Sequence, residues 1–379
     1  MDVSPRLTVC LVGHEEPAFS GTGRYVDRLD AGLRERGVNV IRLSTTPRGS
    51  LSRALGATRH IGWDLNTFFS RYPVRLAWPH ADLYHLMAHT YAAQFAFSRP
   101  PGPTVITVHD IGPFLSRETP ALSGYGHRIH KWFDALAVRS LAKADQIVTV
   151  SEWTRRTLTE SAGLPSDRIE VTHLGVDHAR FHAFEPATTL YERYRLQPGR
   201  PYLLYVGNEE PRKNLDTIWR ALPAIRRAVP EVTLLVVGPE PLPSRHATLL
   251  RLADDLGVRD AIRFIHGVPD SDLPGLYNIG DIVLVPSIYE GFGLPALEAL
   301  ASGRPVVTSS APALLEVTGD AARVVDARDP AALAVAAIDL LSSRGAREEL
   351  GRRGRARSMQ FTWQRTVDRT IEIYREWWQ

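Results

Sequence analysis

Two glutamates flank a glycine-rich turn in the stretch YEGFGLPALEAL. Gly291 and Gly293 are expected to form the turn, and Pro295 suits the first turn of the helix that follows. Carboxylates accept hydrogen bonds from vicinal hydroxyls, such as those of ribose and hexose rings. Glu290 at the end of a strand and Glu298 in the first helical turn therefore predict one site for a hydroxyl-rich ligand.

The start of this helix offers backbone donors between the two acids. The N–H groups of Phe292, Gly293 and Leu294 can face an anion or a hydroxyl at a helix N-terminus. Each acid also has a structural interpretation: Glu298 would interact with the helix dipole, and Glu290 would be a surface loop acid. The pair around one glycine turn favours a ligand site.

A second loop, GNEEPRKNL, places two cations just before a helix. Arg212 forks onto two oxygens and Lys213 supplies a compact charge, a combination that suits a diphosphate. Cations at a helix N-terminus oppose the helix dipole. The pattern therefore favours an anionic partner over the alternative of a solvated pair.

A third loop contains Gly21 and Gly23 in the stretch SGTGRYV, and it precedes an amphipathic helix. Small residues at a helix N-terminus let backbone N–H groups approach an anion. The loop lacks the third glycine of the dinucleotide fingerprint and the Lys-Ser/Thr of a P-loop. A plain turn stays an alternative here, and a dehydrogenase is disfavoured.

One histidine of thirteen stands out by its position. His109 ends the apolar stretch TVITV, and ligand-binding residues of parallel sheets lie at the carboxyl ends of strands. Most of the other histidines are expected to be ordinary core or surface residues.

An acidic DSD stretch covers residues 270–272. It could bind a metal ion, or Asp270 or Ser271 could cap the helix that follows. The capping interpretation is favoured, so no metal and no other cofactor is expected.

These residues need elements to position them, and the sequence alternates apolar and amphipathic stretches. The stretch 23–37 places Tyr25, Val26, Leu29 and Leu33 on one helical face. Alternation of this kind predicts parallel βαβ units. The expected strands are 6–13, 39–45, 83–87, 104–110, 146–151 and 169–175, then 201–207, 232–238, 262–267, 281–287, 304–309 and 321–326.

The two series of strands predict an α/β chain with two Rossmann-like, doubly wound parallel-sheet domains that face each other across a cleft. A polar stretch ending in Pro and Gly separates the series. We expect an N-terminal domain over 1–185, a C-terminal domain over 186–360, and a helix over 361–379 that returns to the N-terminal domain. Val367, Ile371, Tyr374 and Trp378 fall at helical spacing in this last segment.

Composition limits the class of protein. The chain has 379 residues and a net charge of +3, with the basic excess in residues 1–185. This is too weak for nucleic-acid binding, although it allows a loose contact with an anionic membrane surface. The single cysteine, Cys10, lies in an apolar stretch and excludes an internal disulfide. With no apparent signal peptide or membrane span, a cytoplasmic enzyme is expected.

The motifs together resemble the retaining glycosyltransferases of family 4, which have the GT-B fold. The stretches SGTGRYVDRL, TVHDIGPF, IVTVSEWTRRTL, HLGVDHARF, GNEEPRKNL, DLPGLYNIGDIVLVPSIYEGFGLPALEALASGRPVVTS and LLEVTGDAA occur in the family's order over nearly the whole chain. The E-x7-E element from Glu290 to Glu298 is the most specific.

This resemblance implies roles in donor binding. Glu298 would bind the ribose hydroxyls of the nucleotide, and Glu290 the transferred sugar. Arg212 and Lys213 would neutralise the leaving diphosphate. The segment 266–269, with Val268, would hold the nucleobase largely through its backbone.

The resemblance implies further roles in the N-terminal domain. Gly21 and Gly23 would pack under the diphosphate, and His109 would lie beside the sugar and the acceptor. The polar connections 45–80 and 112–130 are expected to bind the acceptor.

The implied reaction transfers a hexose to a glycan or lipid-linked acceptor without a metal ion. GDP-mannose is the favoured donor, and a UDP-sugar is the alternative. A phosphorylase or epimerase on the same fold, and a sugar-nucleotide binder without activity, are weaker alternatives. A phosphorylase would need a lysine for pyridoxal phosphate, and the three lysines have no such context.

Overall fold

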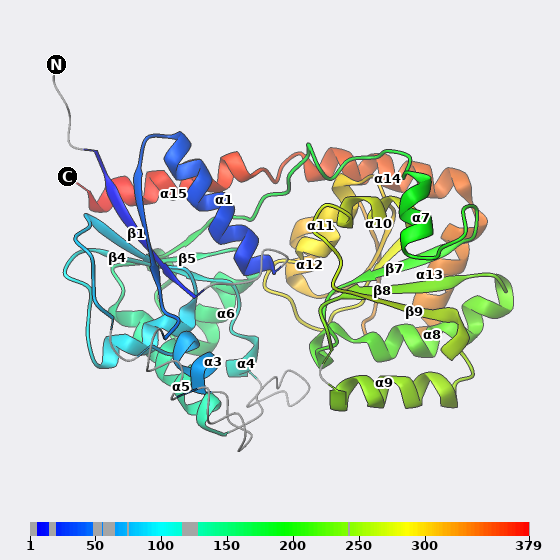
Figure 1. Cartoon of the computed structure of the whole chain (residues 1–379), viewed down its shortest axis with the longest axis horizontal. Helices are drawn as coiled ribbons and strands as arrows, with labels where there is room; N and C mark the ends of the chain where they lie inside the picture. Colours follow the sequence, from blue (N-terminus) through cyan, green and yellow to red (C-terminus); the bar gives the residue numbers. More distant parts are fainter. Residues whose placement is uncertain are drawn as a thin grey trace. The chain divides into compact units, whose positions relative to one another are not determined.

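The computed structural model describes residues 6–14, 20–47, 55, 65–73, 76–115, 128–241 and 243–378. These residues form two compact units (Figure 1). The N-terminal unit comprises Met1–Gly175 and Trp363–Gln379, and the C-terminal unit comprises Val176–Thr362. Much of the expected acceptor-binding connections 45–80 and 112–130 lies outside the described residues.

The division falls after Gly175, upstream of the boundary expected at residues 185 and 186. Val176 forms a parallel bridge with Thr362, and its N–H donates to the Phe361 carbonyl at 3.2 Å. This pairing ties the two ends of the C-terminal unit together. Residues 176–185 therefore belong with the second sheet, which composition alone did not indicate.

The N-terminal unit contains a six-stranded parallel sheet in the order β2-β1-β3-β4-β5-β6. Strands β3, β4 and β5 in the middle are buried throughout, whereas the edge strand β2 is partly exposed. Cys10 is buried in β1, as predicted. The strands are β1 (Thr8–Gly13), β2 (Asn39–Ser44), β3 (Leu83–Leu86), β4 (Thr104–Val108), β5 (Gln146–Thr149) and β6 (Ile169–Val171).

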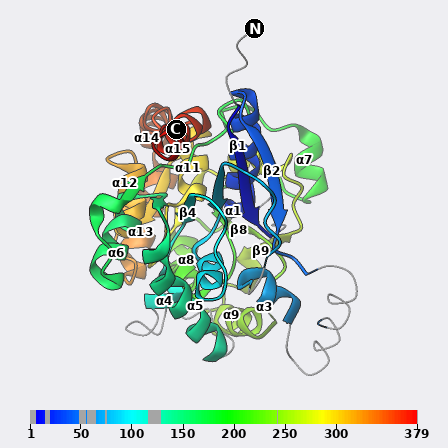
Figure 2. The ribbon, with the colours of Figure 1, turned by 90° about the vertical axis from the view of Figure 1, so that its left-hand side faces the viewer.

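Helices cover both faces of this sheet, and Figure 2 shows them around the strands. The described helices are α1 (Gly21–Glu35), α3 (Leu65–Arg71), η2 (His89–Ala96), α4 (Gly112–Leu115), α5 (Arg128–Ser140), η4 (Leu141–Lys143), α6 (Glu152–Ala162), η5 (Ser166–Arg168) and α15 (Trp363–Trp377). α15 packs on α1 so closely that a Cβ at Gly32 would lie 2.5 Å from the Val367 Cγ2 atom. Val367, Ile371 and Tyr374 are buried, whereas Trp378 follows the end of the helix.

The C-terminal unit contains a second six-stranded parallel sheet in the order β12-β11-β10-β7-β8-β9. β10 and β11 are buried throughout, and the edge strand β12 is mostly exposed. The strands are β7 (Tyr202–Val206), β8 (Thr233–Gly238), β9 (Ile262–His266), β10 (Ile282–Val285), β11 (Val306–Ser309) and β12 (Arg323–Val325). All twelve strands of the described residues fall within the segments expected from the sequence.

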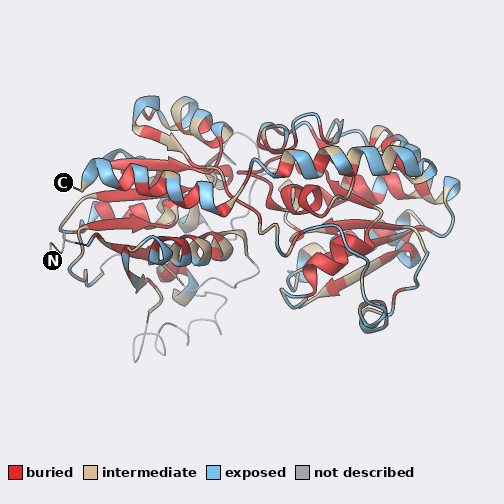
Figure 3. Cartoon of the chain, turned by 90° about the horizontal axis from the view of Figure 1, so that it is seen from above, coloured by how far each residue is buried: buried red, intermediate tan, exposed pale blue. Residues whose placement is uncertain are grey.

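The helices of the C-terminal unit bury apolar faces against this sheet (Figure 3). On α8, for example, Ile218, Trp219 and Leu222 are fully buried among β-strand side chains. The helices are α7 (Thr188–Arg193), η6 (Pro211–Lys213), α8 (Leu215–Ala228), α9 (Pro243–Asp255), η7 (Arg259–Ala261), α10 (Leu273–Ile279), α11 (Leu294–Ala301), α12 (Pro312–Thr318), α13 (Pro330–Ser342) and α14 (Arg344–Ser358). No helix in the described part of the chain is long and apolar enough to span a membrane.

Each sheet reverses its winding direction once. The chain moves outward from β7 through β8 to β9 and then resumes on the other side of β7 with β10. In the N-terminal unit the corresponding position lies between β1 and β3. Ligands of open parallel sheets bind beyond the carboxyl ends of the strands at such switch points. Ligands are therefore expected at the loops after β7 and β10, and after β1 and β3.

Candidate functional site

The switch point of the C-terminal unit brings together three of the predicted site residues. Lys213 and Arg212 lie in η6 after β7, and Glu290 lies in the loop after β10. The Lys213 Nζ atom donates to Glu290 Oε1 at 2.7 Å, and Arg212 Nη1 donates to Glu290 Oε2 at 3.3 Å. Ser287 donates its hydroxyl to Glu290 Oε1 at 2.7 Å. The carboxylate thus receives donors on both oxygens.

Burial makes this cluster electrostatically strong. Glu290 is only 5% exposed, and the side chains of Lys213 and Arg212 are also largely buried. Burial alone would raise the pKa of the Glu290 carboxyl, but Lys213 and Arg212 outweigh it and hold that pKa below its ordinary value. The carboxylate is therefore ionised at neutral pH and fixes the two cations at the switch point.

The backbone holds η6 against the loop after β10. The Ile288 N–H donates to the Arg212 carbonyl at 2.7 Å. Asn214, between η6 and α8, adopts the left-handed conformation with a φ of 60°. Its side-chain amide donates to the carbonyls of Pro286 at 3.0 Å and Ala327 at 2.6 Å. Sequence reasoning missed this buried asparagine, although its position directly after two cations at a helix start was a usable signal.

The glycine turn has the conformation that its sequence predicts. Gly293 precedes α11 with a φ of 105°, in the region that favours glycine. A Cβ there would lie 2.5 Å from Leu314 Cδ2. Phe292 is buried with its ring edge-on to Phe361, and the neighbouring Gly291 and Leu294 are buried too. Leu314 and Phe361 thus pack closely against the turn and fix the N-terminal end of α11.

Glu298 lies further along α11 than predicted. It is the fifth residue of α11 and not part of the first turn, so it is not a dipole-stabilising acid of the helix start. Its side chain is 1% exposed, and Glu298 Oε2 accepts a hydrogen bond from the Tyr277 hydroxyl at 2.8 Å. Tyr277, on α10, is a second residue that sequence reasoning did not single out.

The acidic stretch 270–272 corrects another expectation. The residue before α10 is Asp272, not Asp270 or Ser271, and its side chain makes no capping bond. Asp272 instead accepts from Arg193 at 2.6 Å and from the Tyr194 hydroxyl at 2.7 Å. Asp270 pairs with Arg180 at 2.7 Å. Burial would raise the pKa of Asp272, but Tyr194 and Arg193 lower it below its ordinary value.

The segment expected to hold the nucleobase follows β9. Val268 is partly exposed and comes after Gly267, which has a φ of 63°. Near this strand end, His246 on α9 lies 6.1 Å from His266 between ring centroids. The His246 Nδ1 atom is 2.7 Å from Glu209 Oε1. Glu209 is 7% exposed, a burial that its place in a run of two acids did not indicate.

In the N-terminal unit, the glycines and His109 lie at the switch point between β1 and β3 or beside it. Gly21 and Gly23 are in the first turn of α1 and not before it, and Ser20 caps the helix by accepting from the Gly23 N–H at 2.8 Å. His109 follows β4, and its Nε2 lies 3.0 Å from the Met87 carbonyl, just after β3.

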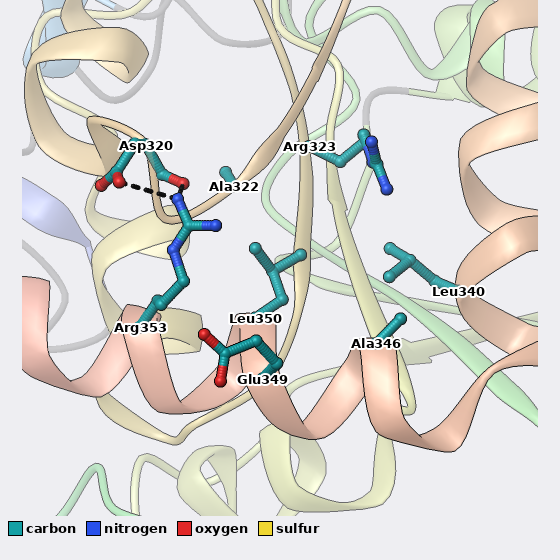
Figure 4. Close-up of a pocket in the computed structure, with 8 residues that line it drawn as sticks. All are labelled: Asp320, Ala322, Arg323, Leu340, Ala346, Glu349, Leu350 and Arg353. Carbon is teal, nitrogen blue, oxygen red and sulfur yellow. Dashed lines mark hydrogen bonds and ion pairs between the residues drawn. The ribbon is translucent and has the colours of Figure 1, made fainter.

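A further pocket of the C-terminal unit lies away from these residues. Figure 4 shows it between β12, α13 and α14, lined by Asp320, Ala322, Arg323, Leu340, Ala346, Glu349, Leu350 and Arg353. Arg353 forms an ion pair with the exposed Asp320 at 2.8 Å across its rim. It contains none of the predicted site residues and no pattern specific to a ligand.

The fold is shared with known structures. Two doubly wound, six-stranded parallel sheets form the GT-B fold of glycosyltransferases. Sucrose-phosphate synthase from Thermosynechococcus elongatus is similar with a TM-score of 0.72, covering 98% of this chain and 99% of that chain at 19% identity. The predicted α/β fold with two doubly wound parallel sheets is thereby confirmed.

Sequence comparison gives the family. Residues 19–180 match Glycosyltransferase Family 4, and residues 188–357 match Glycosyl transferases group 1. The O-antigen chain mannosyltransferase B of Escherichia coli is 33% identical over 310 residues, which cover 80% of this chain and 78% of that protein. The chain belongs to glycosyltransferase family 4.

Two other relatives are matched over part of their length. D-inositol 3-phosphate glycosyltransferase from Salinispora arenicola is 36% identical over 250 residues, covering 62% of this chain and 56% of that protein. A GDP-mannose-dependent alpha-(1-6)-phosphatidylinositol monomannoside mannosyltransferase from Mycolicibacterium smegmatis is 35% identical over 222 residues, covering 56% and 57%. The chain thus spans little more than half of these two relatives.

Proposed function

We propose that the protein is a retaining glycosyltransferase that moves a hexose from a nucleotide sugar to a glycan or lipid-linked acceptor. The observation that carries the proposal is the cluster of Lys213, Arg212 and Glu290 at the switch point between β7 and β10. Buried cations held in place by a carboxylate suit the departure of a diphosphate, because they need no reorganisation as charge develops.

In this mechanism the bond between the anomeric carbon and the diphosphate breaks. Arg212 and Lys213 take up the negative charge of the leaving group. The acceptor hydroxyl forms the new bond on the same face of the sugar, and its proton passes to an oxygen of the leaving phosphate. This path retains the anomeric configuration and needs no protein nucleophile.

Other residues of the C-terminal unit would bind the donor. We assign the ribose hydroxyls to Glu298, which Tyr277 orients, and the transferred sugar to Glu290 with the backbone of Gly291, Phe292, Gly293 and Leu294. Val268 would contact the nucleobase.

The N-terminal unit would supply further contacts. His109 would contact the acceptor, and the helix start at Gly21 and Gly23 would face an anionic group.

For the donor we propose GDP-mannose, with a UDP-sugar as the alternative. Two of the relatives are named as mannosyltransferases, and one of these names specifies GDP-mannose. Glu209 and His246 lie near the end of β9, close to the segment assigned to the base. A non-catalytic binder is disfavoured because the charged cluster is complete.

A thermal-shift screen across GDP-mannose, GDP, UDP-glucose and UDP tests the assignment. GDP-mannose should raise the melting temperature of the wild-type protein, and Glu298→Ala should abolish the shift. Glu348→Ala is the matched control, because Glu348 is an exposed acid of α14 that pairs only along its helix. A full shift in the Glu298 variant would show that this residue does not bind the ribose.

We further propose that no metal ion takes part. Asp270 and Asp272 are each held by an arginine, so they are engaged in ion pairs of the fold. Turnover of GDP-mannose should be the same with and without EDTA. Loss of turnover that added Mg²⁺ or Mn²⁺ restores would overturn this part of the proposal.

A further inference from the structure

A chain of buried polar side chains crosses the N-terminal unit from its C-terminal helix to α1. The Tyr374 hydroxyl on α15 lies 2.5 Å from His85 Nδ1 on β3. His85 Nε2 lies 2.7 Å from the Thr107 hydroxyl on β4. The Thr107 hydroxyl lies 2.9 Å from that of Tyr25 on α1. Four elements thus each contribute one member, and we call these residues the buried polar chain.

The members of this chain are fully enclosed. Tyr374, His85 and Thr107 have no exposed surface, and Tyr25 is 1% exposed. Burial, with a smaller effect of the nearby His109, lowers the pKa of His85 to about 3. Burial also raises the pKa of both tyrosines above their ordinary value. The buried polar chain is therefore uncharged at neutral pH, and its members interact through hydrogen bonds.

The far end of the chain contacts His109. The Tyr25 ring meets the His109 ring edge-on, with centroids 5.1 Å apart and planes at 83°. His109 Nε2 lies 3.0 Å from the Met87 carbonyl. Because a carbonyl can only accept, Nε2 must carry the proton. The ring of His109 is thus fixed in its plane by Tyr25 and in its tautomer by Met87.

The strands connect the same residues a second time. His109 lies two residues after Thr107, just beyond the end of β4, and Met87 lies two residues after His85, just beyond the end of β3. β3 and β4 are neighbours in the sheet. Thr107 and His85 are thus each two residues away from one partner of the hydrogen bond between His109 and Met87.

Packing links α15 to this arrangement. Gly32 on α1 allows Val367 on α15 to approach so closely that the two helices are in direct contact. Tyr374, two turns further along α15, reaches His85 beneath them (Figure 2 shows α1 and α15 in this unit). α15 therefore fixes α1 in two ways. Val367 contacts α1 directly at Gly32, and Tyr374 is connected through the buried polar chain to Tyr25 on α1.

We propose that Tyr374, His85, Thr107 and Tyr25 are positioning residues that hold His109 in the orientation and tautomer needed for transfer. The inference rests on the proposed function, which assigns His109 to the acceptor. It goes beyond that function because it makes the C-terminal helix part of the catalytic arrangement. None of the four residues needs to touch a substrate.

Two substitutions at Thr107 test the proposal. Thr107→Val removes the central hydroxyl at nearly constant volume, and Thr107→Ser keeps it. The valine variant should lower kcat for GDP-mannose turnover about tenfold while its KM changes less than twofold, because a small misplacement of a residue that contacts the acceptor is costly. The serine variant should restore kcat.

A spectroscopic readout separates positioning from activity. Ring ¹H–¹⁵N spectra of the histidines, with His109 assigned through His109→Gln, report its tautomer directly. Thr107→Val should change the His109 signals and Thr107→Ser should not. If the valine variant fails to fold, Tyr25→Phe, which keeps the ring and removes the hydroxyl, carries the same test.

The matched control is Thr370→Val. Thr370 is a fully buried threonine on α15, the helix that carries Tyr374. Its hydroxyl is outside the buried polar chain and donates to the Thr366 carbonyl of α15 at 2.7 Å. It should leave kcat and the His109 signals unchanged.

Unchanged His109 signals in both Thr107→Val and Tyr25→Phe would overturn the proposal, whatever happens to kcat. An equal loss of kcat in the Thr370 control would overturn it too. If Thr107→Val changes the His109 signals but the wild-type protein turns over no nucleotide sugar, the result would instead contradict the proposed function.

Discussion

The pairing of Lys213 with Glu290 sets the chemistry of the candidate site at the scale of single residues. The two residues are far apart in sequence, and each would be costly to bury alone. Together with Arg212 they form a buried cluster with fixed geometry. A preorganised cation of this kind stabilises a leaving diphosphate more than a solvated lysine would.

Replacement of Lys213 by methionine should separate catalysis from folding. We expect Lys213→Met to lower kcat for GDP-mannose by about 10²–10³-fold, the usual cost of losing one preorganised charged contact. It should also lower the free energy of unfolding by about 3 kcal/mol, because Glu290 loses a buried partner. Steady-state kinetics and urea denaturation measure the two effects.

The control for this variant is Arg226→Met. Arg226 pairs with the exposed Asp260 on the surface of the same unit at 2.7 Å. Exposed pairs contribute at most about 1 kcal/mol, and kcat should not change. A Lys213 variant that behaves like this control would show that the buried pair has no role in turnover.

The lowered pKa of Glu290 predicts a pH dependence of stability. Its folded-state pKa lies below the ordinary value of 4.5, so the carboxylate stabilises the fold fully above that pH and loses this effect as pH falls through the folded pKa. Glu290→Gln should therefore be less stable than wild type at pH 7, and the gap should narrow below pH 4.5.

Urea midpoints at pH 7 and at several values below pH 4.5 test this prediction. Glu348→Gln, at an exposed position, should show only a small gap at every pH. A gap between wild type and Glu290→Gln that widens towards acid would contradict the assignment of an ionised, ion-paired Glu290.

At the scale of elements, the start of α11 has a fixed geometry. Gly293 takes a left-handed conformation directly before the helix, and Leu314 on α12 leaves no room for a side chain there. Asn214 takes the same left-handed conformation directly before α8. Its side chain links the loops after β10 and β12. Both helix starts are therefore fixed by backbone geometry and packing.

Gly293→Ala should disturb the site through the backbone. The left-handed conformation and the contact with Leu314 should together lower the free energy of unfolding by about 1–3 kcal/mol, and GDP-mannose should shift the melting temperature less than in wild type. Differential scanning fluorimetry with and without donor measures both.

Gly345→Ala is the matched glycine control. Gly345 lies in α14 with open space around it, so stability should be unchanged or rise by up to about 1 kcal/mol. A Gly293 variant with wild-type stability and donor response would contradict the strained turn.

At the scale of the whole molecule, the chain ends in the unit where it began. α15 buries Val367, Ile371, Ile373 and Tyr374 in the N-terminal unit. Each buried apolar side chain of this size contributes about 1.5–3 kcal/mol, so together they match much of the stability of a typical domain.

Deletion of residues 363–379 should therefore unfold the N-terminal unit. The C-terminal unit ends at Thr362 and should keep its own cooperative transition in scanning calorimetry. Deletion of residues 378–379 alone, beyond α15, is the control. An unchanged melting profile after the long deletion would show that α15 does not stabilise this unit.

The sequence by itself determined the strands, their parallel pairing and the position of the candidate site residues Arg212, Lys213 and Glu290 in loops that follow strands. Apolar stretches bounded by glycine and proline specify strands locally, and alternation with helices requires parallel pairing. The roles of Gly293 and Pro295 also follow from local conformational preference. These features depend on neighbours in sequence and were therefore predictable, as was membership of the family.

Only the tertiary structure decided which side chains meet. The bonds of Glu290 to Lys213, Glu298 to Tyr277 and Glu209 to His246 join segments distant in sequence. The same holds for the buried polar chain, which draws its members from four elements. Hydrogen bonds and ion pairs act over a few ångströms, so their partners depend on the register and packing of the folded chain.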